Sequence, residues 1–186
     1  GRWSRGALED EHAFVLECAK DEIPVIAPLR LSNGSTLGEI SGIYFAVYPK
    51  KFGRPLEITD TGIWYRLGSL IGRLHNAGSR AVASNRITLT PQEATAAEVS
   101  VLVKGNFIAA KWRDEFLRVT DEILGEATPL FKDTEIIRVH GDCHQGNLLE
   151  RGDEGLMVID FDDMVMGPPV QDLWMLLSGE REEMTI

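Results

Sequence analysis

The sequence has little cysteine, and this excludes a small fold held together by a disulfide framework. Of its 186 residues, only Cys18 and Cys143 carry a thiol. They lie far apart and lack the regular spacing of a disulfide framework, so we expect two free thiols in a reducing compartment. For Cys143 we expect an unreactive thiol, with oxidation that affects activity as the alternative.

The sequence also lacks long apolar runs and an excess of positive charge. No apolar stretch approaches the roughly 20 residues of a membrane-spanning helix, and the N-terminus shows no basic-then-apolar signal. We therefore expect a cytoplasmic protein. Acidic residues outnumber basic ones by 29 to 19, for a net charge of -10, which disfavours nucleic acid and anionic membranes as partners. The length suits one ordinary domain or two small lobes.

What the sequence does contain is the polar stretch His-Gly-Asp-Cys-His-Gln-Gly-Asn at 140–147, followed by Ile-Asp-Phe at 159–161. The spacing His-x-Asp-x-x-x-x-Asn is typical of a kinase catalytic loop, and the later Asp supplies a second carboxylate. Asp142 would accept the proton of an attacking hydroxyl. Asn147 and Asp160 would offer oxygen ligands to magnesium, which neutralises the charge of nucleotide phosphates.

The residues around this loop predict short strands. An apolar run at 136–139 is typical of a buried strand, and 148–150 with 156–159 indicate a hairpin turned at 151–155. This hairpin would bring the two carboxylates together.

Helical periodicity predicts helices at 7–20, 106–124 and 170–177, and a further one that is capped at 59–61 and closed by Gly78. The first helix would place Leu8, Val15, Cys18 and Ala19 on one face and Glu9, Asp10 and Glu11 in its first turn. The helix that ends at Gly78 would repeat Ile63, Leu67, Leu70, Ile71 and Leu74 on one face. The helix at 106–124 would use Trp112, Phe116, Val119 and Ile123. A short helix is expected to start at 90–93.

A second hairpin is predicted from 29–31 and 40–47, with its turn at Asn33-Gly34. After it, Lys50, Lys51 and Arg54 are expected to be solvated linker charges. His75 is expected to serve as a core or C-cap histidine.

On its two motifs the chain resembles the aminoglycoside phosphotransferase family, which has the protein-kinase-like fold. The family's loop reads His-Gly-Asp-x-His-x-Gly-Asn and its metal strand Ile-Asp-Phe or Ile-Asp-Trp, as found here. Within the family, the segments 42–49 and 167–177 are similar to bacterial stress-response serine/threonine protein kinases. Similarity extends from about Trp3 to Gly179. The resemblance implies an α+β, two-lobed fold and an ATP- and Mg2+-dependent phosphotransferase.

The resemblance also implies roles for residues outside the loop. Glu11 on the first helix would orient the nucleotide phosphates, with Glu9 as the other candidate and an exposed helix charge as the alternative. Main-chain groups of Val47 and Tyr48 would hold adenine. Asp172 would buttress the catalytic loop, or else lie at a helix start on the dipole.

Supporting roles in the loop are expected for two histidines. His140 would be structural, its ring hydrogen-bonded to loop backbone, and His144 would support it. Asp160 is also expected to act in catalysis by bridging the metal ions, while Asp162 and Asp163 are either supporting residues or solvated carboxylates.

The resemblance divides the chain into a partial N-lobe, 1–48, and a partial C-lobe, 49–186, with the catalytic loop at 140–147 and the metal strand at 156–161. The sequence has no Gly-x-Gly-x-x-Gly, no Walker motif and no lysine-bearing strand before the Glu11 helix. Since those elements clamp phosphates, we expect this stretch alone to bind ATP poorly and to turn over negligibly.

Other readings of the same residues remain open. The acceptor is expected to be Ser or Thr of proteins, with a small alcohol such as an aminoglycoside, choline or homoserine as the alternative. His140, Asp142 and His144 alternate as zinc ligands do in metallohydrolases. A catalytically inactive nucleotide-binding module is the alternative from another class. A monomer is expected.

Overall fold

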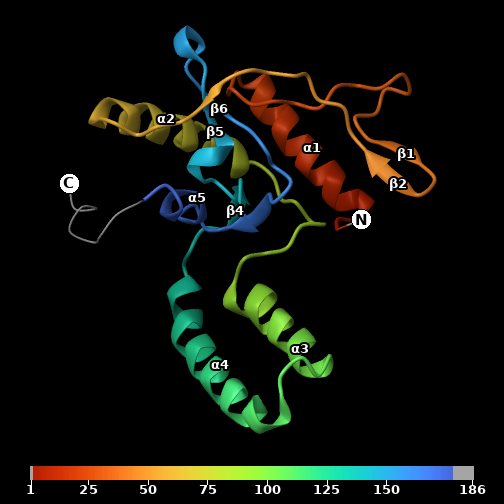
Figure 1. Cartoon of the computed structure of the whole chain (residues 1–186), viewed down its shortest axis with the longest axis vertical. Coiled ribbons are helices and arrows are strands. Elements are labelled where there is room, and N and C mark those ends of the chain that lie inside the picture. Colours follow the sequence, from red (N-terminus) through yellow and green to blue (C-terminus); the bar gives the residue numbers. More distant parts are fainter. Residues whose placement is uncertain (1, 178–186) are drawn as a thin grey trace.

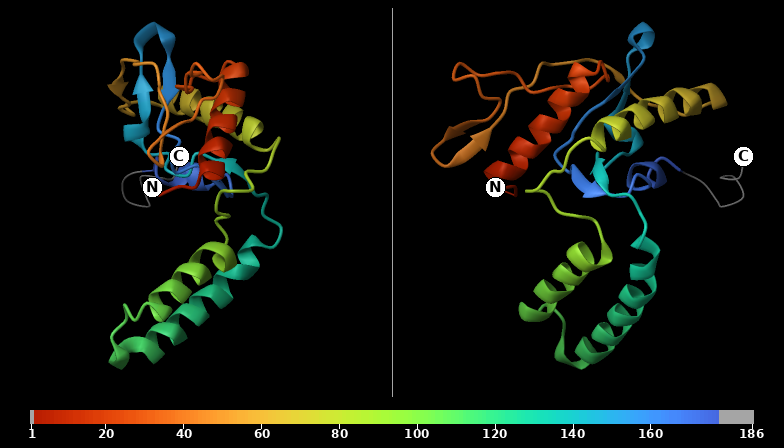
Figure 2. Two further views of the ribbon diagram at one scale, coloured as in Figure 1. Left: turned by 90° about the vertical axis from the view of Figure 1, so that its right-hand side faces the viewer. Right: turned by 180° about the vertical axis from the view of Figure 1, so that it is seen from behind.

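The structure is a computed structural model that describes residues 2–177, which form a body and a projecting arm (Figure 1). The body contains α1, α2 and three small antiparallel sheets, β1-β2, β3-β5-β6 and β4-β7. The arm, residues 91–131, carries α3 and α4 and stands away from the body in every view (Figure 2). This mixture of helices and small sheets is the α+β arrangement that the sequence predicted.

Helix α1 spans Arg5–Lys20 and begins earlier than predicted. Ser4 is its N-cap, because its hydroxyl accepts the Ala7 N–H at 3.2 Å. The helix therefore starts before Ala7, and the predicted placing of Glu9, Asp10 and Glu11 in the first turn is wrong. Ala19 is exposed rather than part of the apolar face, and that face instead buries Phe14 completely.

The hairpin after α1 does not turn where Asn33-Gly34 suggested. Strands β1 (Gly38–Ile40) and β2 (Ile43–Phe45) pair antiparallel with Ile40 opposite Ile43, so the two turn residues are Ser41 and Gly42. Both have positive φ, 53° and 77°, as a hairpin turn of the primed type requires. Residues 29–31 form no strand, and the predicted strand 40–47 is split by the turn.

Helix α2 spans Thr61–Gly78 and confirms the prediction made from its periodicity. Asp60 caps it by accepting the Ile63 N–H at 3.1 Å. All five apolar residues of the predicted face are buried, namely Ile63, Leu67, Leu70, Ile71 and Leu74. At its other end, a Cβ on Gly78 would lie 2.1 Å from Arg138 O, so only glycine allows β4 to approach so closely.

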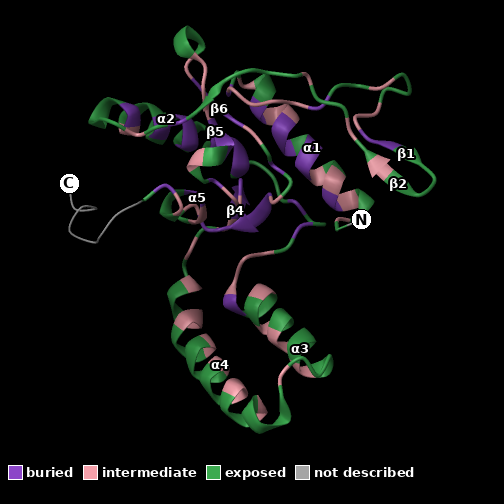
Figure 3. Cartoon of the chain, viewed as in Figure 1, coloured by how far each residue is buried: buried purple, intermediate pink, exposed green. Residues whose placement is uncertain are grey.

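Thr90 immediately precedes the arm, and its hydroxyl accepts the Glu93 N–H, as expected for a helix start there. A single π turn, Pro91–Thr95, leads into α3 (Ala96–Lys104), and a 3-10 turn at Ala110–Trp112 leads into α4 (Arg113–Ala127). The predicted helix 106–124 thus starts too early and ends too early. Neither α3 nor α4 contains a buried residue (Figure 3), and a further 3-10 turn, Thr128–Phe131, closes the arm.

The strands around the predicted loop form largely as expected. β4 (Ile137–Val139) is buried, and β5 (Leu148–Glu150) pairs antiparallel with β6 (Leu156–Val158) across a turn that contains the 3-10 segment Gly152–Glu154. β4 does not join this hairpin but pairs with β7, Val165–Gly167. A short β3, Arg54–Pro55, adds to the free edge of β5.

The predicted helix 170–177 is only one turn long. α5 spans Gln171–Trp174 and is followed by a non-helical turn. Its short length matters because α5 carries Asp172, which is completely buried against the loop after β4.

One apolar core joins α1, α2 and the β5-β6 hairpin. Its completely or almost completely buried members include Phe14, Leu67, Leu74, Leu148, Val158 and Met164. Residues from both proposed lobes, 1–48 and 49–186, contribute to this core; the division itself remains a proposal, and 178–186 lie outside the described residues. Across 2–177, no helix has the length and apolar composition to cross a membrane.

Candidate active site

The loop after β4 is held by the carboxylate of Asp172. Asp172 Oδ2 accepts the His140 N–H and Asp172 Oδ1 accepts the Gly141 N–H, each at 2.9 Å. His75 Nε2, from α2, lies 3.0 Å from the same Oδ2. Three elements therefore meet on one buried carboxylate, which is the arrangement that a buttress of the loop requires.

Glycine is essential at the turn of this loop. Gly141 has a φ of +87°, and a Cβ there would lie 2.1 Å from Asp163 O. Any other residue would be strained in its backbone and would collide with the chain that follows β6.

His140 is completely buried, and both of its ring nitrogens are engaged. Nδ1 accepts the Asp142 N–H at 3.3 Å, so Nε2 carries the proton and donates it to Ile159 O at 2.8 Å. Its ring also packs against Phe161, with centroids 4.6 Å apart. His140 thus ties the catalytic loop to the end of β6.

These contacts argue against His140 as a zinc ligand. A zinc ligand needs a free ring nitrogen, and His140 offers none. His144 Nδ1 accepts the Gly146 N–H, and its Nε2 lies 3.5 Å from Asp142 Oδ2. Across residues 2–177, no three His, Cys, Asp or Glu side chains are gathered so that they could hold a metal by themselves.

Asn147 is buried, and its amide has a defined orientation. Nδ2 donates to Asp142 O at 2.9 Å and lies 3.4 Å from Asp142 Oδ2. Its backbone carbonyl accepts the Ile159 N–H at 3.0 Å. The bonds that the Asn147 side chain makes therefore use its nitrogen, which leaves Oδ1 as the atom for a hard cation, and they connect Asp142 with the residue just before Asp160.

Asp160 follows β6 in an unusual conformation. Its φ is +66°, in the left-handed region that non-glycine residues rarely adopt. Such strain persists where the surroundings fix it and is frequent at functional sites. Partial burial, the hydrogen bond to Asp162 and the charge of that neighbour raise the pKa of the Asp160 carboxyl. Two carboxylates held this close favour a cation between or beside them.

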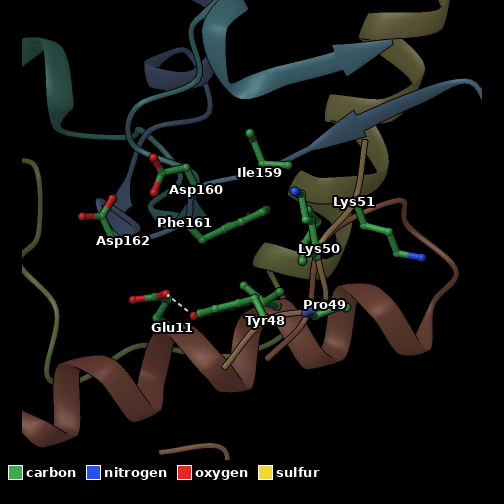
Figure 4. Close-up of a pocket in the computed structure, with 11 residues that line it drawn as sticks. Glu11, Tyr48, Pro49, Lys50, Lys51, Ile159, Asp160, Phe161 and Asp162 are labelled. Atoms are coloured by element: carbon green, nitrogen blue, oxygen red, sulfur yellow. Dashed lines mark hydrogen bonds between the residues drawn. The ribbon is translucent and has the colours of Figure 1, made fainter. Parts of the chain in front are cut away.

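A cavity of about 570 Å3 opens beside Asp160. In Figure 4, Glu11, Asp160 and Asp162 lie at one side of it and Lys50 and Lys51 at the other, with the Phe161 ring between. The remaining lining is mainly apolar and comes from Val15, Ile26, Tyr48, Pro49 and Ile159. A cavity with an apolar middle and a carboxylate end suits a base attached to metal-bound phosphates.

Of the two residues predicted to contact adenine, only Tyr48 lies in the wall of the cavity. Tyr48 lines the cavity, whereas Val47 does not, and Val47 O already accepts the Leu29 N–H at 2.7 Å. Lys50 and Lys51 also line the cavity. Both lysines are exposed and lie in a segment without regular structure, as expected for linker charges.

Glu11 is buried on α1 and faces the cavity rather than open solvent. Its Oε2 pairs with Arg86 Nη2 at 2.7 Å, and its Oε1 lies 3.4 Å from the Tyr48 hydroxyl. Burial raises the pKa of Glu11, an effect that the Arg86 guanidinium opposes. The alternative of an exposed helix charge is excluded for Glu11, while Glu9, which is exposed, pairs with Arg5.

Sequence reasoning missed three residues that touch this site. His75 lies in the last turn of α2 and is largely buried, as expected of a core or C-cap histidine, but its bond to Asp172 was not predicted. Gln171 donates from Nε2 to Gly141 O at 3.0 Å, and Arg86 pairs with Glu11. Gln171 lies in the segment 167–177, which resembles the family, but its bond to Gly141 and the pairing of Arg86 with Glu11 are recognisable only after folding, since the partners lie 30 and 75 residues away.

Comparison with known proteins matches residues 1–185 to the phosphotransferase enzyme family. Stress response kinase A of Escherichia coli (strain K12) is 37% identical over 183 residues, covering 98% of this chain and 55% of that protein. The serine/threonine protein kinase RdoA of Salmonella typhimurium (strain LT2) shows the same identity and coverage. The chain thus spans about half the length of the curated relatives it matches, and the predicted resemblance is confirmed.

Solved structures share the fold at lower identity. Amicoumacin kinase hAmiN, in complex with AMP-PNP, Ca2+ and Ami, superposes with a TM-score of 0.72 at 21% identity, covering 94% of this chain and 53% of that one. The gentamicin complex of APH(2")-IIa gives a TM-score of 0.63 at 16% identity, covering 94% and 60%. These similarities confirm the protein-kinase-like α+β fold.

Proposed function

Because the chain belongs to the phosphotransferase enzyme family, we propose that the protein is an ATP- and Mg2+-dependent kinase that phosphorylates Ser or Thr of proteins in a stress response. The observation that carries the proposal is the oriented Asn147 amide, which bonds Asp142 through nitrogen and keeps its oxygen for a cation. The relatives named stress response kinase A and serine/threonine protein kinase support the acceptor and the role.

Asp142 is the general base in this proposal. It is half-buried, so it reaches an incoming hydroxyl, and its backbone is fixed by the His140 ring. A carboxylate within hydrogen-bond reach of the hydroxyl can take its proton as the phosphorus–oxygen bond forms. His144, 3.5 Å from Asp142 Oδ2, supports the orientation of this carboxylate.

The donor set fits magnesium. Asn147 Oδ1 and the Asp160 carboxylate are hard oxygen donors, and the crowding of Asp160 by Asp162 gives this corner a need for positive charge. When bound, Mg2+ would supply electrostatic stabilisation of the phosphates. Since two protein ligands do not complete an octahedral shell, water and phosphate oxygens would fill the rest.

ATP would occupy the cavity beside Asp160. Glu11 would lie at the phosphate side of the cavity, and Tyr48 and the main chain of Val47 at its base-binding side. Because the Val47 carbonyl is already hydrogen-bonded, Tyr48 is the stronger candidate for contact with adenine. The division into lobes at 48/49 belongs to the same proposal, as do a cytoplasmic location, a monomeric state and the lack of nucleic-acid or membrane partners.

The test is nucleotide binding by the full-length protein, with and without Mg2+, measured by titration calorimetry. We expect Mg2+-dependent ATP binding that Asp160→Ala abolishes and that the matched control Asp153→Ala, in the exposed β5-β6 turn, retains. Asp142→Asn should still bind ATP but lose turnover by about 100- to 10,000-fold, the usual contribution of a general base.

Either of two results would contradict the proposal. The first is no ATP binding by the full-length wild-type protein at millimolar Mg2+. The second is Asp160→Ala binding ATP as wild type does. Where binding is found, a screen of proteins and small alcohols as phosphate acceptors decides between Ser/Thr and a small-molecule hydroxyl.

A further inference from the structure

Arg86 is a buried arginine that has no role in the phosphotransfer mechanism proposed above. Its side chain is completely buried in the body, just before the arm. Nε donates to Ala7 O at 2.8 Å, Nη2 to Glu11 Oε2 at 2.7 Å and Nη1 to Asp162 O at 2.5 Å. One guanidinium thus joins the start of α1, a side chain on the cavity wall and the backbone just past Asp160.

We propose that Arg86 is a positioning residue for the phosphotransfer site, holding Glu11 and the 160–162 turn in fixed relation across the cavity. This inference rests on the proposed kinase function. Arg86 touches neither nucleotide nor acceptor in this role, because it is completely buried and is not among the residues that line the cavity. It acts through Glu11 and through the carbonyl of Asp162.

The geometry favours positioning over simple stabilisation of the core. Burying a guanidinium is costly unless every donor finds a partner, and an apolar side chain of similar size would fill the same space without that cost. Arg86 directs its donors to three separate segments, which only the planar, multi-donor guanidinium can do. Trp3 covers it, with its ring 4.4 Å from the guanidinium carbon, and so separates these bonds from solvent.

The connection continues from Glu11 to the base-binding side of the cavity. The Tyr48 hydroxyl lies 3.4 Å from Glu11 Oε1 and 3.3 Å from His12 Nε2, while His12 Nδ1 lies 2.8 Å from Thr36 Oγ1. In Figure 4, Glu11 and Tyr48 point toward each other between α1 and the cavity. A polar chain therefore runs from the segment beside Asp160 to the segment that would hold adenine.

A displaced 160–162 turn would misplace Asp160, which is already in the strained left-handed region. A shift of about 1 Å in a catalytic group can cost about 100-fold in rate. Loss of Arg86 should therefore lower kcat and raise the Mg2+ concentration needed for half-maximal rate, with a smaller change in KM for ATP.

The experiment compares Arg86→Lys and Arg86→Gln with the control Arg80→Gln in the full-length protein. Arg80 lies at the surface and pairs with Asp21 away from the cavity. Kcat, KM for ATP and the Mg2+ requirement are measured at a temperature at which each variant is folded by circular dichroism. Lysine keeps the charge but cannot reach Ala7, Glu11 and Asp162 together, so we expect about a 100-fold lower kcat for Arg86→Lys and wild-type values for Arg80→Gln.

If Arg86→Gln does not fold, the variant Glu11→Gln provides a second test. If Arg86 acts through Glu11, Arg86→Lys combined with Glu11→Gln should lose less than the product of the two single losses. A kcat and Mg2+ requirement within twofold of wild type for folded Arg86→Lys would overturn the inference, as would full additivity of the two losses. Wild-type protein without Mg2+-dependent ATP turnover would instead refute the proposed function itself.

Discussion

Cys143 lies inside the candidate catalytic loop, yet its surroundings remove its reactivity. The side chain is completely buried. Burial, with added repulsion from the Asp172 and Asp142 carboxylates, raises the pKa of its thiol to about 12. Cys18 is equally buried, and burial raises its pKa to about 12 as well. Since only the thiolate attacks, neither residue should act as a redox sensor in the folded protein.

This gives a prediction on pH and modification. At pH 8 a thiol with a pKa of about 12 is almost entirely protonated, whereas an unfolded cysteine, with a pKa of about 8.5, is partly ionised. Iodoacetamide should therefore leave both cysteines unmodified in the native protein and alkylate both in denaturant. Mass spectrometry reads the result, with glutathione as the reactive control. Alkylation of Cys143 in native protein at the rate of glutathione would contradict the raised pKa.

At the scale of elements, α5 matters through one side chain. Asp172 accepts the N–H groups of His140 and Gly141 and lies within hydrogen-bond distance of His75. It therefore fixes the entry to the catalytic loop from α2 and α5 at once. Because the carboxylate is completely buried, its removal would leave two N–H groups in the interior without their protein acceptor.

We expect Asp172→Ala to lower the free energy of unfolding by about 1–3 kcal/mol for each of the two donors left without an acceptor. Asp172→Asn retains one acceptor oxygen and should lose less. Urea unfolding measures both, with Glu122→Ala, an exposed residue of α4, as the control. A loss below about 1 kcal/mol for Asp172→Ala would show that the loop does not depend on this carboxylate.

The sequence could predict elements whose boundaries are set by local signals. α2 has an Asp60 cap and a regular apolar face, and the β5-β6 hairpin joins two short apolar runs around a polar, glycine-containing turn. The hairpin β1-β2 was misplaced because Asn33-Gly34 is a good turn in itself, as the Gly34 N–H to Leu31 O bond shows. Local preference cannot tell which of two possible turns joins paired strands.

The start of the arm helix α4 also escaped prediction, and for a physical reason. The segment 106–112 has apolar residues at helical spacing, but Asn106 has a φ of +55°, which ends α3 and delays α4 until Arg113. In the site, the loop motif identified Asp142, Asn147 and Asp160 as candidates. It could not identify Arg86, because its partners are brought near only by tertiary folding.

At the scale of the molecule, two buried arginines attach α1 to the body. Arg86 bonds Ala7 O and Glu11, and Arg138 bonds Glu17 at 2.6 Å while donating to Ala77 O and Gly78 O at the end of α2. Arg138 also lies over the Phe14 ring at 4.7 Å. The cavity wall formed by α1 is therefore attached to the rest of the body at two separate places.

The arm has none of this support. Across the described residues, α3 and α4 contribute nothing to either core cluster, and several of their apolar side chains are exposed, among them Val101, Leu102 and Ile123. Elements with few buried contacts open locally at a lower free energy than the core. The body and the arm should consequently differ in stability.

Hydrogen exchange on this chain tests that difference. We expect amides of α4 to exchange at least about tenfold faster than those of α2, which corresponds to about 1.4 kcal/mol of opening free energy. A matched pair of substitutions gives a second reading. Leu74→Ala, at a completely buried position, should cost about 2–5 kcal/mol, whereas Ile123→Ala, at a position 58% exposed, should leave the unfolding of the body unchanged. Equal protection of α4 and α2 would mean that a further surface covers the arm in solution.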